Sequence, residues 1–367
     1  MKQRKKISAD IVADSIDSRG NRITSFILTY PRFIHAELMT HRMFSRNAAS
    51  SRAIPFKKMV QMIKEDPFIP IAWQKDHKGM QGTEYETDLL NINAKENEWL
   101  IARNHAINQA MQLSNMKVTK QICNRLLEPF QWYTSLVTAT EFDNFFALRL
   151  PTYEVSSNFK WEHDPNPVWT DVYSSKKDLL KDWKMPDSWT DLDWIRMSTS
   201  GAEIHIQALA EAMLDAMTES NPNDLIEGEW HIPFGDRFDD EILKDLIALD
   251  DGSLSAYVIR EGHDFGRKIQ RLEELKLKVA VARAARLSYM TFDGDIDYKK
   301  DIELHDILLK HRHMSPFEHV AKAMTEEEYR YFSKNHAYIN GKGGFAQPGW
   351  CNNFRGFVPY RYIVEND

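Results

Sequence analysis

The chain has 367 residues, 43% of them hydrophobic and 28% charged, which is an ordinary composition for a soluble globular protein with a sizeable core. Its formal net charge of −7 argues against a general nucleic-acid-binding protein, because phosphate contacts need clustered Lys and Arg. With only two cysteines, the chain cannot be a disulfide scaffold. No segment has the apolar run of a signal peptide or the roughly 18 apolar residues of a membrane span. We therefore expect a soluble cytoplasmic protein.

Two β-strands joined by a tight turn are predicted near the start of the chain. Residues 7–16 and 23–30 are rich in β-forming side chains, and residues 17–21 supply the Gly and Asn of a hairpin turn. The apolar segment 33–39 is then expected to form a helix that leads into a polar loop. Apolar residues at helical spacing predict further helices at 55–64, 99–113 and 118–127, whereas 66–83 contains Pro and Gly and is expected to be irregular.

The second half of the chain combines predicted helices with one unusual segment. The Trp-rich, charged segment 153–198 has a turn-like composition and is interpreted as an excursion from a single domain, 1–367. His205 is interpreted as a histidine at the edge of the core and not as a catalyst. Helices are expected at 142–150, 202–217, 239–250 and 302–311, the third of them in an acidic linker region.

The polar loop at residues 40–52 is the most distinctive stretch of the sequence. It contains three Arg, three Ser, a His and an Asn, and it has no acidic residue. Guanidinium and hydroxyl donors match phosphate oxygens, so this composition suits an anionic ligand. On composition alone, a solvated basic turn remains an equal alternative.

Four segments of this chain carry a family resemblance. The first is the pattern His-Arg-x-x-Ser-x-Asn-x-x-Ser-x-Arg at 41–52, here called the signature loop, and the others are Asn-Phe-x-x-x-Arg at 144–149, Arg-Ala-Ala-Arg-x-Ser at 283–288 and His-Met-Ser-Pro-Phe-Glu-His at 313–319. Together they resemble the motifs of the flavin-dependent thymidylate synthases. The resemblance covers 23–54, 120–150, 200–215 and 278–320.

The order of the motifs differs from that of compact family members, in which the last two come first. We interpret this chain as a circularly permuted and enlarged member of phage type, which would place it in the cytoplasm of a host cell. The resemblance implies an α/β (α+β) fold in which a helix bundle packs beside a largely antiparallel sheet. Segment 278–362 is then a displaced piece that carries part of the flavin site, and 283–288 is expected to lead from a strand into a helix.

The resemblance implies a reaction as well as a fold. The expected activity is methylation of dUMP at carbon 5 to give dTMP, with methylenetetrahydrofolate as one-carbon donor and FAD reduced by NADPH. Cofactor and folate then supply the chemistry, so Cys123 and Cys351 are interpreted as structural. The expected assembly is a homotetramer with shared active sites, and no nucleic-acid or membrane partner is expected.

The resemblance also implies the site residues. Arg149 is the expected catalytic residue, because the matching arginine contacts the pyrimidine ring and favours its ionised form. The expected nucleotide-binding residues are Glu37, Thr40, Ser50, Ser51, Arg52, Arg125 and Arg149. The expected flavin-binding residues are His41, Arg42, Asn47, Asn144, Ser288, His313, Ser315, Glu318 and His319, and no metal ligand is expected.

Three positions depart from the family pattern and leave the substrate open. Thr40 stands where an Arg is usual, Ala48 where a Glu is common, and Glu37 where a Gln lies near the nucleotide. A carboxylate there suits an exocyclic amine, which donates a hydrogen bond where a carbonyl cannot.

Three alternative functions remain open from the sequence. The first is a flavin-dependent hydroxylase or hydroxymethylase that acts on dCMP or dUMP. The second is a metalloenzyme that uses His311, His313, Glu318 and His319, whose residue types suit zinc or non-haem iron. The third is an inactive scaffold protein.

Overall fold

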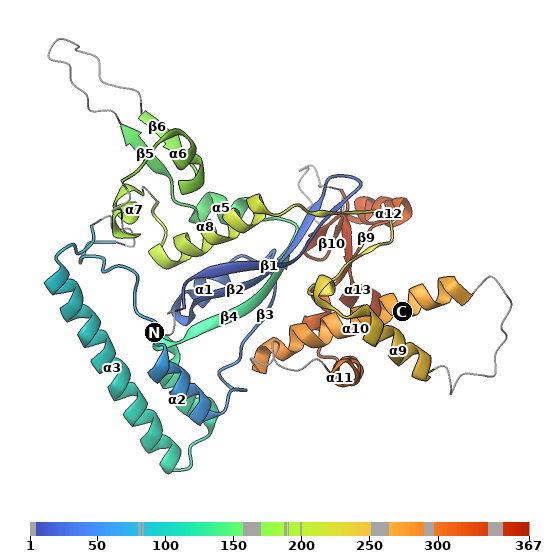
Figure 1. Cartoon of the computed structure of the whole chain (residues 1–367), viewed down its shortest axis with the longest axis horizontal. Helices are drawn as coiled ribbons and strands as arrows, with labels where there is room; N and C mark the ends of the chain where they lie inside the picture. The colour runs from blue at the N-terminus through green and yellow to red at the C-terminus, as the bar shows by residue number, and fades with distance from the viewer. Residues whose placement is uncertain are drawn as a thin grey trace, which may run out of the picture.

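A five-stranded sheet forms the centre of the computed structural model, which describes residues 5–79, 82, 84–156, 170–186, 189, 191–198, 200–250, 264–289, 297–336 and 348–366. Its strand order is β3–β4–β2–β1–β7, and every pair is antiparallel except β1 with β7 (Figure 1). The strands are β1 (Ser8–Asp17), β2 (Arg22–Pro31), β3 (Ser45–Ala48), β4 (Trp132–Ala139) and β7 (Asn223–Leu225). The predicted hairpin is confirmed, and Gly20 takes the left-handed conformation, with φ of 84°, that its turn requires.

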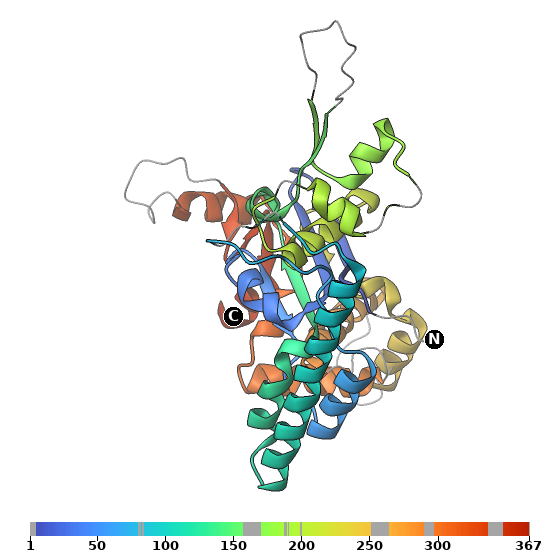
Figure 2. The same cartoon turned by 90° about the vertical axis from the view of Figure 1, so that its left-hand side faces the viewer.

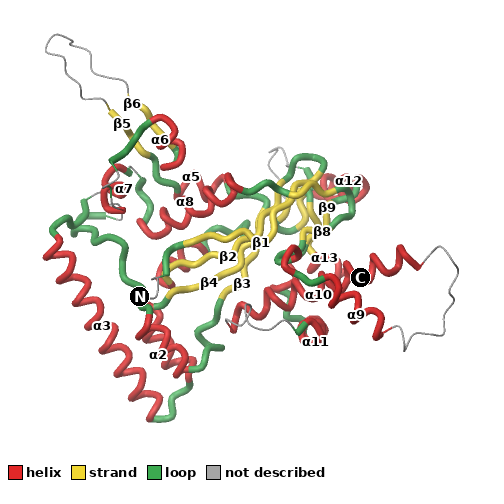
Figure 3. The backbone as a smooth tube through the Cα atoms, in the orientation of Figure 1, coloured by secondary structure: helices red, strands yellow, loops and turns green. Residues whose placement is uncertain are grey.

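Two helices cover one face of this sheet. They are α8 (Ile204–Glu219) and α5 (Asp143–Arg149), as the sequence predicted, and they lie above the strands in Figure 3. Alternate residues of β2, Phe26, Leu28 and Tyr30, are fully buried in one cluster with Leu209 and Met213 of α8. Strand alternation and helix periodicity therefore build one apolar layer.

The opposite face is covered by α10 (Asp264–Arg286) and the short 3₁₀ helix Leu287–Tyr289. Ala284 and Leu287 pack on Ile27 and Leu136, which point to this side of the sheet. The expected change from strand to helix at 283–288 is therefore wrong: α10 continues to Arg286 and a 3₁₀ turn follows. Residues 279–285 are buried without a break, which is typical of a helix that is covered on all sides.

Two further helices, α9 (Asp240–Asp250) and α11 (Tyr298–Lys310), pack against α10. Leu243 of α9 is fully buried against Val279 and Tyr298. Residues 240–250 thus belong to the packed body of the protein, and their expected place in a linker is wrong.

The helices that follow the signature loop form a separate layer at the side of the sheet. Figure 2 shows α3 (Leu89–Asn115) running lengthwise beside α2 (Phe56–Glu65). Asp88 caps α3 by accepting from the backbone N–H groups of Leu90 and Asn91, so the helix begins ten residues before the predicted start. The remaining short helices here are 3₁₀ Arg32–Ile34, α1 (His35–Leu38), α4 (Lys120–Cys123) and 3₁₀ Asn124–Phe130.

The Trp-rich segment 153–198 has structure of its own and projects from the body beyond α5 and α8 (Figure 1). Tyr153 anchors it, because its buried hydroxyl donates to Glu211 Oε1 of α8 at 2.5 Å. The described elements are a hairpin of β5 (Tyr153–Ser156) and β6 (Thr170–Tyr173), followed by α6 (Lys176–Asp182) and α7 (Asp191–Met197). Part of the predicted excursion, 157–169, lies outside the described residues.

The C-terminal region packs short strands against the central sheet. The strands are β8 (Trp230–His231), β9 (Ala321–Ala323) and β12 (Phe357–Pro359) in one sheet and β10 (Trp350–Cys351) with β11 (Phe354–Arg355) in another. They are accompanied by 3₁₀ helices Gly235–Arg237 and Ser315–Glu318 and by α12 (Glu326–His336) and α13 (Tyr360–Asn366).

Both cysteines are buried and unbridged, as their structural interpretation requires. Burial raises the pKa of Cys351 to about 12, which removes it from nucleophilic chemistry at neutral pH. Within the described part of the chain, no helix combines the length and the apolar character needed to cross a membrane.

Candidate functional site

Strand β3 is the centre of the candidate site and forms one edge of the five-stranded sheet. Ser45 to Ala48 pair with Thr138 to Ser135 of β4, so part of the predicted polar loop is a strand. Asn124 fixes the chain beyond this strand, since its amide donates to Ser51 O at 2.6 Å and Ile54 O at 2.9 Å. The signature loop is therefore held on a rigid edge.

The C-terminal third of the chain lies directly against this strand. The side-chain amide of Asn47 donates to Ala284 O at 3.3 Å, and the Ser315 hydroxyl donates to the Asn47 side-chain oxygen. The backbone N–H of Ser50 donates to Ser288 O at 3.0 Å. Segments that are more than 200 residues apart in sequence are thus brought together in space.

Arg149, at the end of α5, lies between Glu37 and His41. Its Nε is 3.4 Å from Nε2 of His41, and its Nη1 is 4.0 Å from Oε2 of Glu37. The Arg149 side chain is 22% exposed, and these two neighbours set the direction of its guanidinium. A fixed cation at the surface of a donor-rich strand is suited to bind an anionic ring or phosphate.

The two neighbours of Arg149 have shifted pKa values. Burial, with the positive charges of Arg149 and Arg46, lowers the pKa of His41, which is therefore neutral at pH 7 and accepts from Arg149. Burial, with the negative charge of Glu203, raises the pKa of Glu37 in spite of the nearby Arg149. Glu37 is thus a carboxyl group whose proton is held more firmly than usual.

An acidic residue from another segment, the 3₁₀ helix Asn124–Phe130, lies against the predicted phosphate end of the loop and was not expected from the sequence. Glu128 Oε1 accepts from the Ser51 hydroxyl at 2.8 Å and lies 3.8 Å from Arg125 Nη1. Its other oxygen lies 4.0 Å from Arg32 Nη2. The spacing of three residues between Arg125 and Glu128 on one helical segment is the signal that predicts this pair.

Most of the other predicted site residues are exposed, and Glu318 is half-buried. Arg42, Asn144, His313, Ser315 and Arg52 are exposed, as is Thr40, whose hydroxyl donates to Glu37 O at 2.7 Å. Glu318 is half-buried and pairs with Arg361 of α13.

His319 is completely buried and belongs to a chain of hydrogen bonds that runs beneath the site. Its Nδ1 is 2.9 Å from the Thr138 hydroxyl, which is 2.6 Å from the Ser25 hydroxyl. Ser25 is bonded in turn to Nε2 of His231 at 2.8 Å, and Nδ1 of His231 lies 2.9 Å from the Ser15 hydroxyl. In this structure the His319 ring does not face solvent, and its role at a flavin stays a prediction.

His231 and His319, the two histidines in this chain of hydrogen bonds, make the stability of the protein depend on pH. Burial lowers the pKa of His231 and His319 to about 3, against an ordinary value of 6.5. The unfolded chain therefore takes up protons first as pH falls, and we expect the free energy of unfolding to drop between pH 6.5 and pH 3. Each histidine contributes roughly 1.4 kcal/mol per pH unit. Chemical denaturation across this range measures the slope, which His231→Gln is expected to reduce; an unchanged slope in that variant would contradict the assignment.

The four residues of the metalloenzyme alternative do not converge. His319 is buried against Thr138, Glu318 pairs with Arg361, and His311 and His313 are exposed. Among the residues that the structure describes, no group of three or more His, Cys, Asp or Glu is arranged to hold a metal ion. His205 is buried, with Nδ1 bonded to Glu203 and Nε2 accepting from the backbone of Ile71, which agrees with its interpretation as a structural histidine.

Comparison with known proteins gives distant likenesses only. No family model and no curated protein matches the chain. A crystal structure of the UMP/dUMP methylase PolB from Streptomyces cacaoi bound with 5-Br dUMP is similar with a TM-score of 0.39 and 14% identity, over 60% of this chain and 93% of that chain. The same methylase bound with 5-Br UMP gives a TM-score of 0.38 and 15% identity, over 59% and 90% of the two chains. Likenesses at these TM-scores are too distant to decide the fold or the reaction of this chain.

Proposed function

We propose that this chain is a flavin-dependent enzyme that modifies carbon 5 of a pyrimidine deoxynucleoside monophosphate, in the first instance by methylating dUMP to dTMP. One observation carries the proposal. The signature loop, Arg149, Ser288 and Ser315 come from four separate segments, and each contacts or adjoins the same edge of the sheet. The circular permutation is part of this proposal, and it is supported by the contact between Ser315 of the displaced segment and Asn47 of the signature loop.

The donors along this edge fit a flavin dinucleotide. Arg42 and His313 are exposed and would suit its phosphates, and Ser288 would hold a neighbouring polar group. Asn47 and Ser315, whose donors are used within the protein, would form the wall between them. When bound, FAD reduced by NADPH supplies the electrons for the transfer of the one-carbon unit of methylenetetrahydrofolate. Shared sites in an assembly of several copies are part of the same proposal.

The residues of the chain bind and polarise the nucleotide. Arg149 holds a positive charge against the pyrimidine ring and stabilises the negative charge that develops there as carbon 5 becomes nucleophilic. Neutral His41 accepts from Arg149 and fixes the direction of its guanidinium. Ser50, Ser51 and Arg52 bind the phosphate, with Arg125 at the margin of the same site.

Binding and product analysis of the purified protein test this proposal. We expect the protein to be yellow or to take up added FAD, and to convert dUMP to a product heavier by one methylene group when methylenetetrahydrofolate and NADPH are present. Omission of the folate is expected to abolish this product. Failure to bind FAD, together with unchanged dUMP, would refute the proposal and favour the scaffold alternative.

A second candidate substrate, dCMP, is favoured by the position of Glu37. Its carboxyl group lies 4.0 Å from Arg149, so in its ionised form it places an acceptor beside the cation that binds the ring. Cytosine carries an exocyclic amine that donates to such an acceptor, whereas uracil carries a carbonyl there. Hydroxylation or hydroxymethylation of dCMP is therefore the alternative reaction.

A substitution at Glu37 tests which of the two bases the enzyme prefers. We expect Glu37→Gln to lower the ratio of kcat/KM for dCMP over dUMP about 10-fold, because an amide oxygen is a weaker acceptor for the amine than a carboxylate and the amide NH₂ can donate to the uracil carbonyl instead. Mass spectrometry of products from competing dCMP and dUMP measures this ratio. Glu303→Gln, which removes an exposed acid of α11, is the control and should leave it unchanged. An unaltered ratio in Glu37→Gln would show that Glu37 does not read the base.

A further inference from the structure

Five buried polar residues connect the central sheet with the motif 313–319. They are Ser15 of β1, Ser25 of β2, Thr138 of β4, His231 of β8 and His319, which follows the 3₁₀ helix Ser315–Glu318. None of the five is more than 4% exposed. Ser25 and Thr138 are paired directly across β2 and β4, so their side chains lie on one face of the sheet. The four hydrogen bonds between the five residues therefore form one continuous path across three strands.

The two hydroxyls in the middle of this path give it a single direction. Ser25 and Thr138 each have two hydrogen-bond partners on the path but only one proton to donate. If Ser25 donates to Thr138, Thr138 must donate to Nδ1 of His319. Ser25 must then accept from Nε2 of His231. If Thr138 donates to Ser25 instead, every one of these bonds is reversed.

The direction of the hydroxyls sets the tautomer of both imidazole rings. Burial lowers the pKa of His231 and of His319 to about 3, so each ring is neutral at pH 7 and carries one proton. In the first direction both rings carry this proton on Nε2, and in the reverse direction both carry it on Nδ1. Opposite tautomers would leave two donors or two acceptors facing each other, at the cost of one buried hydrogen bond. The tautomers of the two rings are therefore coupled.

The two ends of the path differ in their surroundings. Ser15, whose hydroxyl is 2.9 Å from Nδ1 of His231, is one of the residues in the wall of a cavity of about 350 Å³. Asn223 and Asp236 line the same cavity and are exposed, so the cavity is open to water. At the other end, Nε2 of His319 is buried and has no hydrogen-bond partner among the described residues. The Ser15 end is therefore the one that lies beside water.

We propose that this path is a proton relay with two states, in which His231 and His319 share one tautomer and change it together. In one change of state, Ser15 passes its proton to Nδ1 of His231 and takes another from water in the cavity. His231 passes the proton of its Nε2 to Ser25, and Ser25 passes its own proton to Thr138. Thr138 passes its proton to Nδ1 of His319, and Nε2 of His319 releases one to a base such as water. One proton enters and one leaves, so the hydrogen bonds end reversed and the charge of the relay is unchanged.

The tautomers of the two rings test the relay without any reaction at Arg149. Long-range ¹H–¹⁵N spectra of the protein with labelled histidine report them, and His231→Gln and His319→Gln assign the signals. We expect the two rings to show the same ratio of the Nε2–H to the Nδ1–H tautomer, because each mismatch costs one buried hydrogen bond. Opposite tautomers at the two rings would overturn the proposal.

Thr138→Val separates a relay from a hydrogen bond that only holds a ring in place. Valine keeps the shape of the side chain but has no hydroxyl, so it interrupts the path between Ser25 and His319. Exchange of the His319 ring proton with solvent should become about 10-fold slower, because this proton must then exchange by local opening of the fold. If the hydroxyl is only structural, exchange already needs local opening, and losing a bond makes it faster. Faster or unchanged exchange would therefore contradict the relay.

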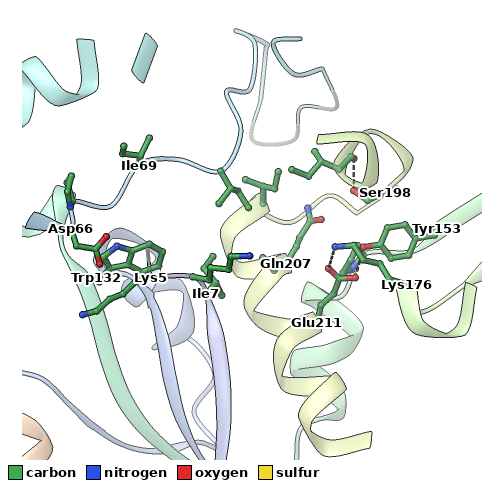
Figure 4. Close-up of a pocket in the computed structure, with 17 residues that line it drawn as sticks. Lys5, Ile7, Asp66, Ile69, Trp132, Tyr153, Lys176, Ser198, Gln207 and Glu211 are labelled. Atoms are coloured by element: carbon green, nitrogen blue, oxygen red, sulfur yellow. Dashed lines mark hydrogen bonds and ion pairs between the residues drawn. The ribbon is translucent and has the colours of Figure 1, made fainter. Parts of the chain in front are cut away.

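Matched controls exist for the threonine and for a serine of the path. Thr134→Val removes a buried hydroxyl from the same strand, β4, that takes no part in the path. Ser25→Ala repeats the test if Thr138→Val does not fold, and its control is Ser198→Ala, in the wall of a different cavity beside α8 (Figure 4). Thermal unfolding checks that each variant is folded. Both controls should leave the exchange unchanged, and equal slowing in them would overturn the proposal as well.

Discussion

Replacing Arg149 with alanine is expected to lower kcat/KM for the pyrimidine nucleotide by at least about 100-fold, the usual cost of losing one fixed group that stabilises charge in a transition state. Its side chain is 22% exposed, and its Nε donates to His41 at 3.4 Å, so the guanidinium is restricted in direction while the side chain is in part open to a ligand. Steady-state kinetics measure the loss.

The fold should survive this change. The contact of Arg149 with Glu37 is 4.0 Å long and partly exposed, so its removal costs less than about 1 kcal/mol of unfolding free energy. Arg149→Lys is expected to restore charge but not the forked geometry, and to recover only part of the activity. Arg330→Ala, on an exposed face of α12, is the control for loss of an arginine. Activity within a few-fold of the parent protein in Arg149→Ala would remove Arg149 from the chemistry.

The largest expected effect on stability is that of Asp301→Ala. Asp301 of α11 is completely buried, accepts from Arg286 Nε at 2.5 Å and forms an ion pair with Arg283 Nε at 2.9 Å, both arginines being on α10. Its removal leaves two guanidinium groups with low exposure and without their shared carboxylate, so we expect a loss of about 3–5 kcal/mol in the free energy of unfolding. Chemical denaturation measures this loss.

A neighbouring acid on the same helix supplies the comparison. Glu303 of α11 is exposed, so Glu303→Ala should cost less than about 1 kcal/mol. Comparable losses in the two variants would show that the pair of arginines is stable without Asp301. The backbone oxygen of Ala284, also on α10, accepts from the side chain of Asn47 in β3. Asp301→Ala loosens the contact of α11 with α10 and is therefore expected to weaken this edge of the candidate site as well.

The elements that the sequence predicted correctly are those whose signal is local. The hairpin follows from the turn at 17–21, and α8 follows from apolar residues spaced along one face. The early start of α3 escaped prediction because Leu89 and Leu90 are 73% and 80% exposed, so its first turns have no buried face. Only the cap at Asp88 marks this start.

The elements that escaped prediction are those made by partners distant in the chain. Residues 45–48 form a strand because β4 pairs with them, although their own sequence is that of a polar loop. The ion pairs of Arg283 and Arg286 could not be predicted from local sequence either, because their partner Asp301 lies on another helix, α11. The motifs indicated which segments belong to one site, but the distances within it required the folded chain.

The hydrogen bond between Asn47 and Ser315 spans 268 residues of sequence. During synthesis, β3 therefore leaves the ribosome long before the segment that covers it, although β4 follows much sooner. Domains fold from the N-terminus as they emerge, so the central strands can assemble before the segment that contains Ser315 packs against β3. The completeness of the candidate site is thus coupled to the translation of residues 278–320: a nascent chain that stops before residue 278 contains Arg149 and the signature loop but not the second half of the site.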